Sequence, residues 1–150
     1  MSSPILLDTS VVLFLARNNG PAGAIRQRHN IGGSGVFPFL SIVSVGEARV
    51  MAARRQWGEN KVKILDSIIN SCIRVPIFNQ VIDNYVGATL FSENFPGGAR
   101  NPGKNDLWIA ATAKAMGATL ITTDDDFSHF AHGFLNVEMF DISGKIKIHP

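Results

Sequence analysis

The sequence predicts an α/β fold, a three-layer α/β/α arrangement around a mainly parallel five-stranded sheet. Short apolar runs typical of buried strands alternate with longer segments that have the periodicity of helices. Strands that alternate with helices are joined by crossover connections, which place helices on both faces of a parallel sheet. The chain has 150 residues, the size of one compact domain, and its sequence contains no internal repeat or low-complexity tract. We therefore expect residues 1–150 to form a single domain.

The first part of the chain predicts one strand followed by two helices. The apolar run Pro4–Leu7 is expected to be a buried strand that delivers Asp8 to a loop. Val11–Arg17 is expected to form a helix. Pro21 is favourable in the first turn of another helix, which should run to about His29.

The middle of the chain predicts two strands and two helices. Phe37–Val43 is apolar and is expected to be the second strand. Ser44–Glu47 fits the S-x-x-E pattern of a capping box and predicts a helix that continues through Arg55. Glu59–Ser71 has a broad apolar face at helical spacing, and Ile73–Val75 is expected to be the third strand.

The last part predicts two helices and two strands around a loop that is rich in glycine and proline. Gly117 is typical of a helix end and separates the second of these helices from the fourth strand. The expected elements are a helix over Asn79–Phe91, a loop over Ser92–Lys104, a helix over Asp106–Met116, and strands over Ala118–Thr123 and Val137–Phe140.

Acidic residues occur where this layout brings distant parts of the chain together. Asp8 ends the first strand, Glu47 lies on the helix after the second strand, and Asp106 opens the helix before the fourth strand. The triplet Asp124–Asp126 directly follows the fourth strand. Ligands of open parallel sheets bind beyond the carboxyl ends of the strands, so these acids are expected to share one pocket there.

Such a cluster of carboxylates predicts a divalent metal centre. Carboxylates held close together repel one another, and some would take up protons if nothing neutralised them. Hard oxygen ligands favour Mg²⁺ or Mn²⁺. One or two such ions can activate water and stabilise the leaving oxygen of a phosphodiester, which requires carboxylates and no covalent nucleophile.

Four segments of the sequence resemble the acidic motifs of PIN-domain nucleases, and the closest likeness is to the VapC and FitB toxins. The motifs come in the family's order and span residues 5 to 127. They read Ile-Leu-Leu-Asp8-Thr-Ser-Val, Ser44-Val-Gly-Glu47, Lys104-Asn-Asp106-Leu-Trp-Ile-Ala-Ala and Leu-Ile-Thr-Thr-Asp124-Asp-Asp126-Phe. Each motif alone is a weak indication of the family, whereas all four motifs in the family's order are a strong one.

The resemblance implies a parallel five-stranded sheet, a Mg²⁺ or Mn²⁺ site and endonucleolytic cleavage of structured RNA. It also implies a homodimer and a small antitoxin protein that blocks the site and binds promoter DNA. Asp8, Glu47, Asp106 and Asp124 match the family's acidic quartet, and Asp126 matches an additional acid of the last motif.

Residues around the quartet have supporting roles in this interpretation. Thr9 or Ser10 would orient the first carboxylate, and Thr123 would support the last motif. Lys104 and Asn105 flank Asp106 and are candidates to contact the scissile phosphate. The arginines that follow Glu47 are candidates to contact RNA phosphates, or else form a solvated helix face; they are Arg49, Arg54 and Arg55.

Structural roles compete with the catalytic ones at several positions. Glu47 would be needed in a capping box whether or not it binds a metal. Asp106 would be favourable in the first turn of any helix. Asp125 is expected to be the solvated member of its triplet. No zinc site is expected at His129 and His132, which follow the last motif and are interpreted as surface residues. Trp108 is expected in the core.

Composition points to a cytoplasmic protein that acts on a polyanion. Five of the 12 acids are assigned to the pocket, which leaves seven acids against 14 lysines and arginines on the rest of the molecule. The single cysteine, Cys72, cannot form an internal disulfide, which favours a reducing compartment. Asp8 interrupts the apolar N-terminal run, so we expect neither a signal peptide nor a membrane span.

Three other functions remain as alternatives. A phosphatase would use an aspartate after the first strand as its nucleophile, but the second aspartate expected two positions later is Ser10. A non-catalytic module that binds RNA or a partner would have no need for the acids. A PIN nuclease that processes RNA outside toxin–antitoxin systems would share every motif described above.

Overall fold

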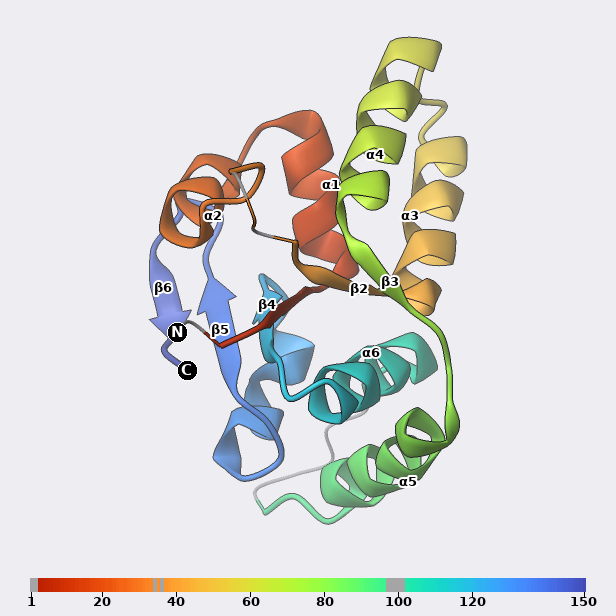
Figure 1. Ribbon diagram of the computed structural model, residues 1–150. Coiled ribbons are helices and arrows are strands. Elements are labelled where there is room, and N and C mark those ends of the chain that lie inside the picture. The colour runs from red at the N-terminus through yellow and green to blue at the C-terminus, as the bar shows by residue number, and fades with distance from the viewer. Residues whose placement is uncertain (1–2, 34, 36, 97–101) are drawn as a thin grey trace.

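The protein is built around one β-sheet that carries helices on both faces (Figure 1). The computed structural model describes residues 3–33, 35, 37–96 and 102–150. Within these ranges six strands lie in the order β3-β2-β1-β4-β5-β6. The first five are parallel, and β6 pairs with β5 in the antiparallel sense. The strands are β1 (Ile5–Leu7), β2 (Phe39–Ser41), β3 (Ile73–Val75), β4 (Thr119–Thr122), β5 (Val137–Phe140) and β6 (Ile146–Ile148).

The helices form the two outer layers, which lie above and below the sheet in Figure 1. The upper layer contains α1 (Thr9–Arg17), α2 (Ala22–His29), α3 (Ile42–Arg54) and α4 (Glu59–Ser71). The lower layer contains α5 (Asn79–Glu93), α6 (Lys104–Ala115) and the 3₁₀ helix η1 (Asp125–His132). This arrangement confirms the α/β/α fold class, with one strand more than the five expected.

Two apolar cores lie between these layers, one on each face of the sheet. Leu7 and Ile121 belong to the core beneath α1, α3 and α4. Leu6 and Leu120 belong to the core beneath α6 and η1. Successive side chains of a strand point to opposite faces, so a strand buried on both faces is apolar throughout. This is why β1 is apolar throughout and why the two central residues of β4, Leu120 and Ile121, are both apolar.

The start of α3 differs from the sequence prediction. The expected strand over Phe37–Val43 ends at Ser41, and the expected capping box at Ser44 and Glu47 is wrong. Ser41 is the N-cap instead, because its hydroxyl oxygen accepts a hydrogen bond from the backbone N–H of Val43 at 3.1 Å. Glu47 consequently lies well inside α3, so capping does not explain why a glutamate occupies this position.

Other element ends shift by a few residues. α1 begins at Thr9, not Val11, because Asp8 caps it, and α6 begins at Lys104, two residues before the expected start. α5 extends to Glu93. Residues 97–101 of the expected loop lie outside the described residues. No helix in the described ranges has the length and apolar character needed to cross a membrane.

Candidate metal centre

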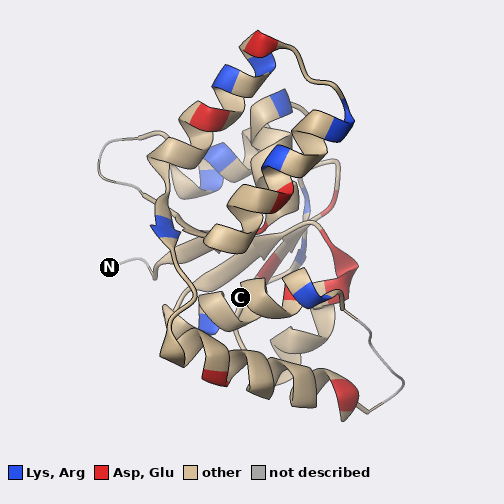
Figure 2. Cartoon of the chain, turned by 90° about the vertical axis from the view of Figure 1, so that its right-hand side faces the viewer, with Lys and Arg blue, Asp and Glu red and all other residues tan. Residues whose placement is uncertain are grey.

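The sheet brings the acidic residues of four distant segments to one edge. Asp8 directly follows β1, and Asp124 lies two residues after β4, the strand that pairs with β1. Asp106 lies in the first turn of α6, and Glu47 lies on α3, which starts at the end of β2. Figure 2 shows acidic segments gathered at this edge between the two helical layers, whereas basic segments are spread mainly over the upper layer.

Three carboxylates form the tightest group in the described part of the chain. Asp106, Asp124 and Asp126 each offer one carboxylate oxygen, and these oxygens all lie within 4.8 Å of one another. The backbone assists this arrangement, because Asp124 caps η1 and its Oδ1 accepts a hydrogen bond from the N–H of Asp126 at 2.9 Å. Asp106 and Asp124 are half-buried, and Asp126 is exposed. The group therefore faces solvent on one side.

Asp8 lies deeper and is held by hydrogen bonds from three residues. It is only 4% exposed. Its Oδ1 accepts from the N–H of Thr9 at 2.7 Å, and its Oδ2 accepts from the hydroxyls of Ser10 at 2.9 Å and Thr122 at 2.8 Å. Burial raises the pKa of Asp8 to about 6, although the hydrogen bonds oppose this effect; the charge of Asp124 adds to it. The carboxylate of Asp8 is thus fixed in orientation.

Asp106 is the carboxylate most affected by its neighbours. Burial and the nearby charges of Asp8, Asp124 and Glu47 together raise its pKa to about 7, while a hydrogen bond with the backbone of Gly103 acts in the opposite direction. The negative charges of three other acids therefore act on the carboxylate of Asp106. Bringing these groups together has an electrostatic cost that a bound cation would remove.

Glu47 connects the two helical layers at the edge of the sheet. Its Oε1 accepts a hydrogen bond from the hydroxyl of Thr9 at 2.6 Å, and its Oε2 accepts one from the side-chain amide of Asn105 at 3.0 Å. The Thr9 hydroxyl also lies 2.9 Å from the hydroxyl oxygen of Ser44. Hydrogen bonds from a residue of α1 and a residue of α6 therefore hold the Glu47 carboxylate in place, beside Asp106.

Serine and threonine hydroxyl groups form hydrogen bonds with the acids and with one another. Thr123 donates to the hydroxyl oxygen of Ser10 at 2.9 Å, so two of the three supporting residues that the sequence named are in contact. Thr122 and Ser44, both buried, were not among the candidates from the sequence. A signal for Thr122 exists, since it is the last residue of β4 and stands two residues before Asp124. Ser44 has no comparable signal.

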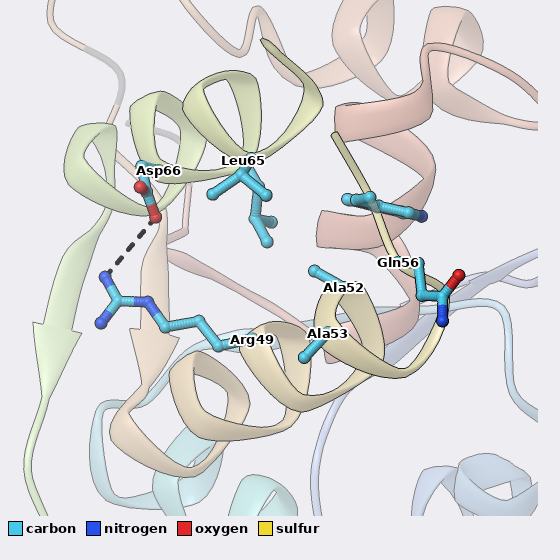
Figure 3. Close-up of a pocket in the computed structure, with 8 residues that line it drawn as sticks. Arg49, Ala52, Ala53, Gln56, Leu65 and Asp66 are labelled. Atoms are coloured by element: carbon cyan, nitrogen blue, oxygen red, sulfur yellow. Dashed lines mark ion pairs between the residues drawn. The ribbon is translucent and has the colours of Figure 1, made fainter. Parts of the chain in front are cut away.

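Several candidates lie apart from the cluster. Asp125 is exposed and pairs with Lys147 at 3.2 Å, in keeping with its expected orientation away from its neighbours. Lys104 is exposed at the start of α6. Arg49 lies 3.6 Å from Asp66 across the pocket between α3 and α4, so its guanidinium is turned toward α4 (Figure 3).

Two expectations about ring-bearing residues need correction. His129 is not a surface residue: it is 1% exposed, and its Nε2 lies 2.7 Å from the hydroxyl oxygen of buried Ser92. The fold of η1 against α5 buries it, which helical spacing alone does not indicate. His132 is exposed as expected. Trp108 is half-buried rather than fully in the core, and it stacks on Tyr85 between α5 and α6.

The composition of this centre suits a hard divalent cation. The donors are carboxylate oxygens, which Mg²⁺ and Mn²⁺ prefer over the softer nitrogen and sulfur ligands. Burial, and to a smaller extent the charges of neighbouring acids, raise the pKa of Asp8 to about 6 and that of Asp106 to about 7. A bound cation would compensate the charges of these acids, so the residues present fit such an ion.

Comparison with known proteins supports this assignment at the level of family. No curated protein sequence matches the chain significantly. The complex of VapBC2 from Rickettsia felis bound to a fragment of promoter DNA is 19% identical, with a TM-score of 0.75 over 91% of this chain and 98% of that one. FitAcB from Neisseria gonorrhoeae is 23% identical, with a TM-score of 0.67 over 89% and 95% of the two chains.

A third solved structure is described as a member of the VapBC family of toxin–antitoxin systems. It is VapBC-5 from Mycobacterium tuberculosis, which is 21% identical and has a TM-score of 0.63 over 94% of this chain and 100% of that one. At these identities the likeness concerns the fold. The sequence itself matches the PIN domain family over residues 5–133, which include all of the acids described above. The chain therefore belongs to the PIN domain family.

Proposed function

We propose that this protein is a metal-dependent endoribonuclease that hydrolyses phosphodiester bonds in RNA. The observation that carries the proposal is the group of three carboxylates whose oxygens lie within 4.8 Å, with two further acids beside it. Mg²⁺ or Mn²⁺ is the proposed cofactor. Asp8, Glu47, Asp106 and Asp124 are the proposed catalytic residues, and Asp126 is a proposed additional ligand.

The proposed division of roles follows from how each side chain is held. Asp106, Asp124 and Asp126 would bind the cation, which supplies positive charge beside the scissile phosphate and makes a bound water more acidic. Asp8 is fixed by Thr9, Ser10 and Thr122, so it would keep its orientation during the reaction.

Residues at the rim would contact the substrate. Glu47 is held by Thr9 and Asn105 and would orient groups next to the cation. Lys104 and Asn105 are proposed to contact the scissile phosphate from the start of α6. Arg49 would have to leave Asp66 before it could bind a phosphate.

We further propose that the chain is the toxin of a toxin–antitoxin pair. Membership of the PIN family supports the nuclease, and the fold is that of the VapBC and FitAcB structures. The proposed partner is a small antitoxin protein that blocks the acidic edge. A PIN nuclease without such a partner is the alternative, and copurification of a small protein encoded next to this chain distinguishes the two.

A homodimer is proposed through the outer face of α5. Ile82, Val86 and Leu90 recur at i, i+4 spacing, and their side chains are each about half exposed. This stripe carries no charge, so two copies can meet there without repulsion. Burying it would remove apolar surface that is unusual on a monomer.

The nuclease is tested by incubating RNA with the purified chain in Mg²⁺, in Mn²⁺ or in EDTA. We expect discrete cuts that require the metal and vanish in Asp8→Asn and Asp106→Asn. Asp125→Asn is the matched control, because it removes an acid of the same segment that pairs with Lys147 outside the cluster. Its activity should remain near that of the unaltered chain.

Two results would contradict this proposal. Cleavage that persists in Asp106→Asn would show that the acidic cluster is not the active site. A folded protein that binds RNA without cutting it in either metal would favour a non-catalytic PIN module. Circular dichroism of each variant establishes that it is folded.

A further inference from the structure

A groove runs along α3 away from the acidic cluster. Its volume is about 390 Å³. Asn105 of α6 closes one end of it, and the remaining lining residues share one face of α3, at spacings of three or four residues. They are Val43, Gly46, Glu47, Val50, Met51 and Arg54.

The inner end of this α3 groove is continuous with the candidate metal centre. Glu47 and Asn105 line the groove and are hydrogen-bonded to each other at 3.0 Å. Asp106, one of the three clustered carboxylates, is the next residue after Asn105. A polymer whose phosphate lies at the acids therefore has the α3 groove as an adjoining surface.

The floor of the groove is apolar and open. Val50 is 47% exposed, and Met51 is half-buried beside it. Gly46 is exposed, and a side-chain carbon added there would meet nothing within 4 Å. The helix backbone at Gly46 is therefore accessible. Such a surface suits a flat, partly apolar group such as a nucleobase.

The outer end of the groove carries a positive charge. Arg54 is exposed, and among the described residues it forms no ion pair, unlike Arg49 on the other side of the helix. Seven residues separate Arg54 from Glu47, which places them about 10 Å apart along the helix axis. The groove thus has acids at one end, an apolar floor, and an unpaired guanidinium at the other end.

We propose that the α3 groove binds the RNA nucleotide next to the scissile phosphate, with its base on Val50 and Met51 and a following phosphate on Arg54. This inference rests on the proposed nuclease function and names its substrate class. A base that rests against α3 cannot be paired within a duplex, and proteins read RNA sequence mainly at such unpaired positions. The substrate is therefore RNA that is single-stranded at the cut.

Binding of RNA, measured apart from its cleavage, tests the groove. All variants are made in an Asp8→Asn background, and fluorescence anisotropy reports the affinity for a short single-stranded RNA and for the same RNA in a duplex. Gly46→Leu fills the floor, and a leucine is favourable within a helix where its side chain meets no neighbour. Arg54→Gln removes the charge at the outer end.

Matched controls make the same changes elsewhere. Gly23→Leu alters an exposed glycine of α2 that also has nothing within 4 Å, and Lys63→Gln removes an exposed charge from α4. We expect Gly46→Leu to lower the affinity for single-stranded RNA about tenfold, equivalent to the loss of one good contact. Arg54→Gln should lower it severalfold and reduce its salt dependence. The controls should bind as the background does, and the duplex should bind more weakly.

The inference is overturned if Gly46→Leu and Arg54→Gln bind single-stranded RNA as the controls do, or if the duplex binds equally well. A change in the sedimentation coefficient of Gly46→Leu with unchanged RNA affinity would assign the groove to a second copy of the chain instead. Cleavage by the chain with native Asp8 is a separate result, so the groove and the nuclease can fail independently.

Discussion

Asp8 and Asp106 are two acids of the cluster whose pKa values are raised by folding. Folding places them where their charged forms are poorly solvated and close to other acids, so the pKa of Asp8 rises to about 6 and that of Asp106 to about 7. A group whose pKa is higher in the folded protein than in the unfolded chain binds protons more tightly when folded. The charged cluster therefore opposes folding in the absence of metal.

This gives a pH dependence with a definite sign. The contribution of these acids to stability is fully present below their unfolded pKa of about 4 and is lost as pH rises through about 6 and 7. We expect the unfolding temperature of the metal-free protein, relative to that of Asp106→Asn, to fall between about pH 5 and 8. Mg²⁺ should reduce this fall because it replaces the protons. Thermal unfolding in EDTA and in Mg²⁺ measures it, and a relative rise with pH in EDTA would refute this explanation.

At the residue scale, the sequence indicated the clustered acids more completely than the serine and threonine residues that surround them. Asp8, Glu47, Asp106 and Asp124 fall at strand ends or in recognisable motifs, so their convergence follows from a parallel sheet. Thr122 and Ser44 contact the cluster only because segments far apart in the chain meet, and a serine or threonine in an apolar run has no distinctive pattern. Burial of His129 likewise depends on how η1 packs against α5.

At the scale of elements, the start of α3 decides where Glu47 points. Ser41 caps the helix, so Glu47 lies in its second turn and reaches Thr9 and Asn105. The sequence predicted Ser44 as the cap, but the cap is Ser41, and the hydroxyl of Ser44 is instead buried against Thr9. Local sequence signals could not make this choice.

A substitution at the cap tests this assignment. Ser41→Ala removes the hydrogen bond to the N–H of Val43 and should destabilise the protein by about 1 kcal/mol, as is usual for an N-cap. Ser41→Thr retains the hydroxyl acceptor without introducing a buried charge and is the matched variant, with a smaller expected loss. Urea denaturation measures both. Equal stability of Ser41→Ala and the unaltered protein would mean that the cap contributes nothing.

A helix and the strand after it were predicted with their bounds, and β6 was not predicted. Glu59–Ser71 and Ile73–Val75 form the expected helix and strand without a shift of either boundary. β6 has three residues, of which one is a lysine, and it pairs only along the edge of β5. β3, at the other edge of the sheet, is equally short and also contains one basic residue, so length and edge position alone do not separate the two strands.

At the scale of the whole molecule, most basic residues lie on a different layer from the apolar stripe of α5. Basic residues lie mainly on the layer of α1 to α4, whereas α5 carries no lysine or arginine and exposes Ile82, Val86 and Leu90 (Figure 2). The basic layer of α1 to α4 is thus available to a polyanion, and the apolar stripe of α5 is available to a second copy of the chain.

The proposed dimer is tested with a charge on the stripe. Val86→Lys should convert a dimer into a monomer in sedimentation analysis, because two lysines would face each other in an apolar contact. Asn60→Lys adds the same charge to the exposed side of α4 and should leave the dimer intact. A monomer at all concentrations before substitution, or a dimer that survives Val86→Lys, would exclude this interface.

The central claim is that the acids at the edge of the sheet form a divalent metal centre. Calorimetric titration of the metal-free protein with Mn²⁺ near pH 7 tests it most directly. We expect saturable binding to the unaltered chain and to Asp125→Asn, with release of protons from the cluster, and strongly weakened binding to Asp106→Asn. The absence of binding to the unaltered chain, or equal binding to Asp106→Asn, would contradict it.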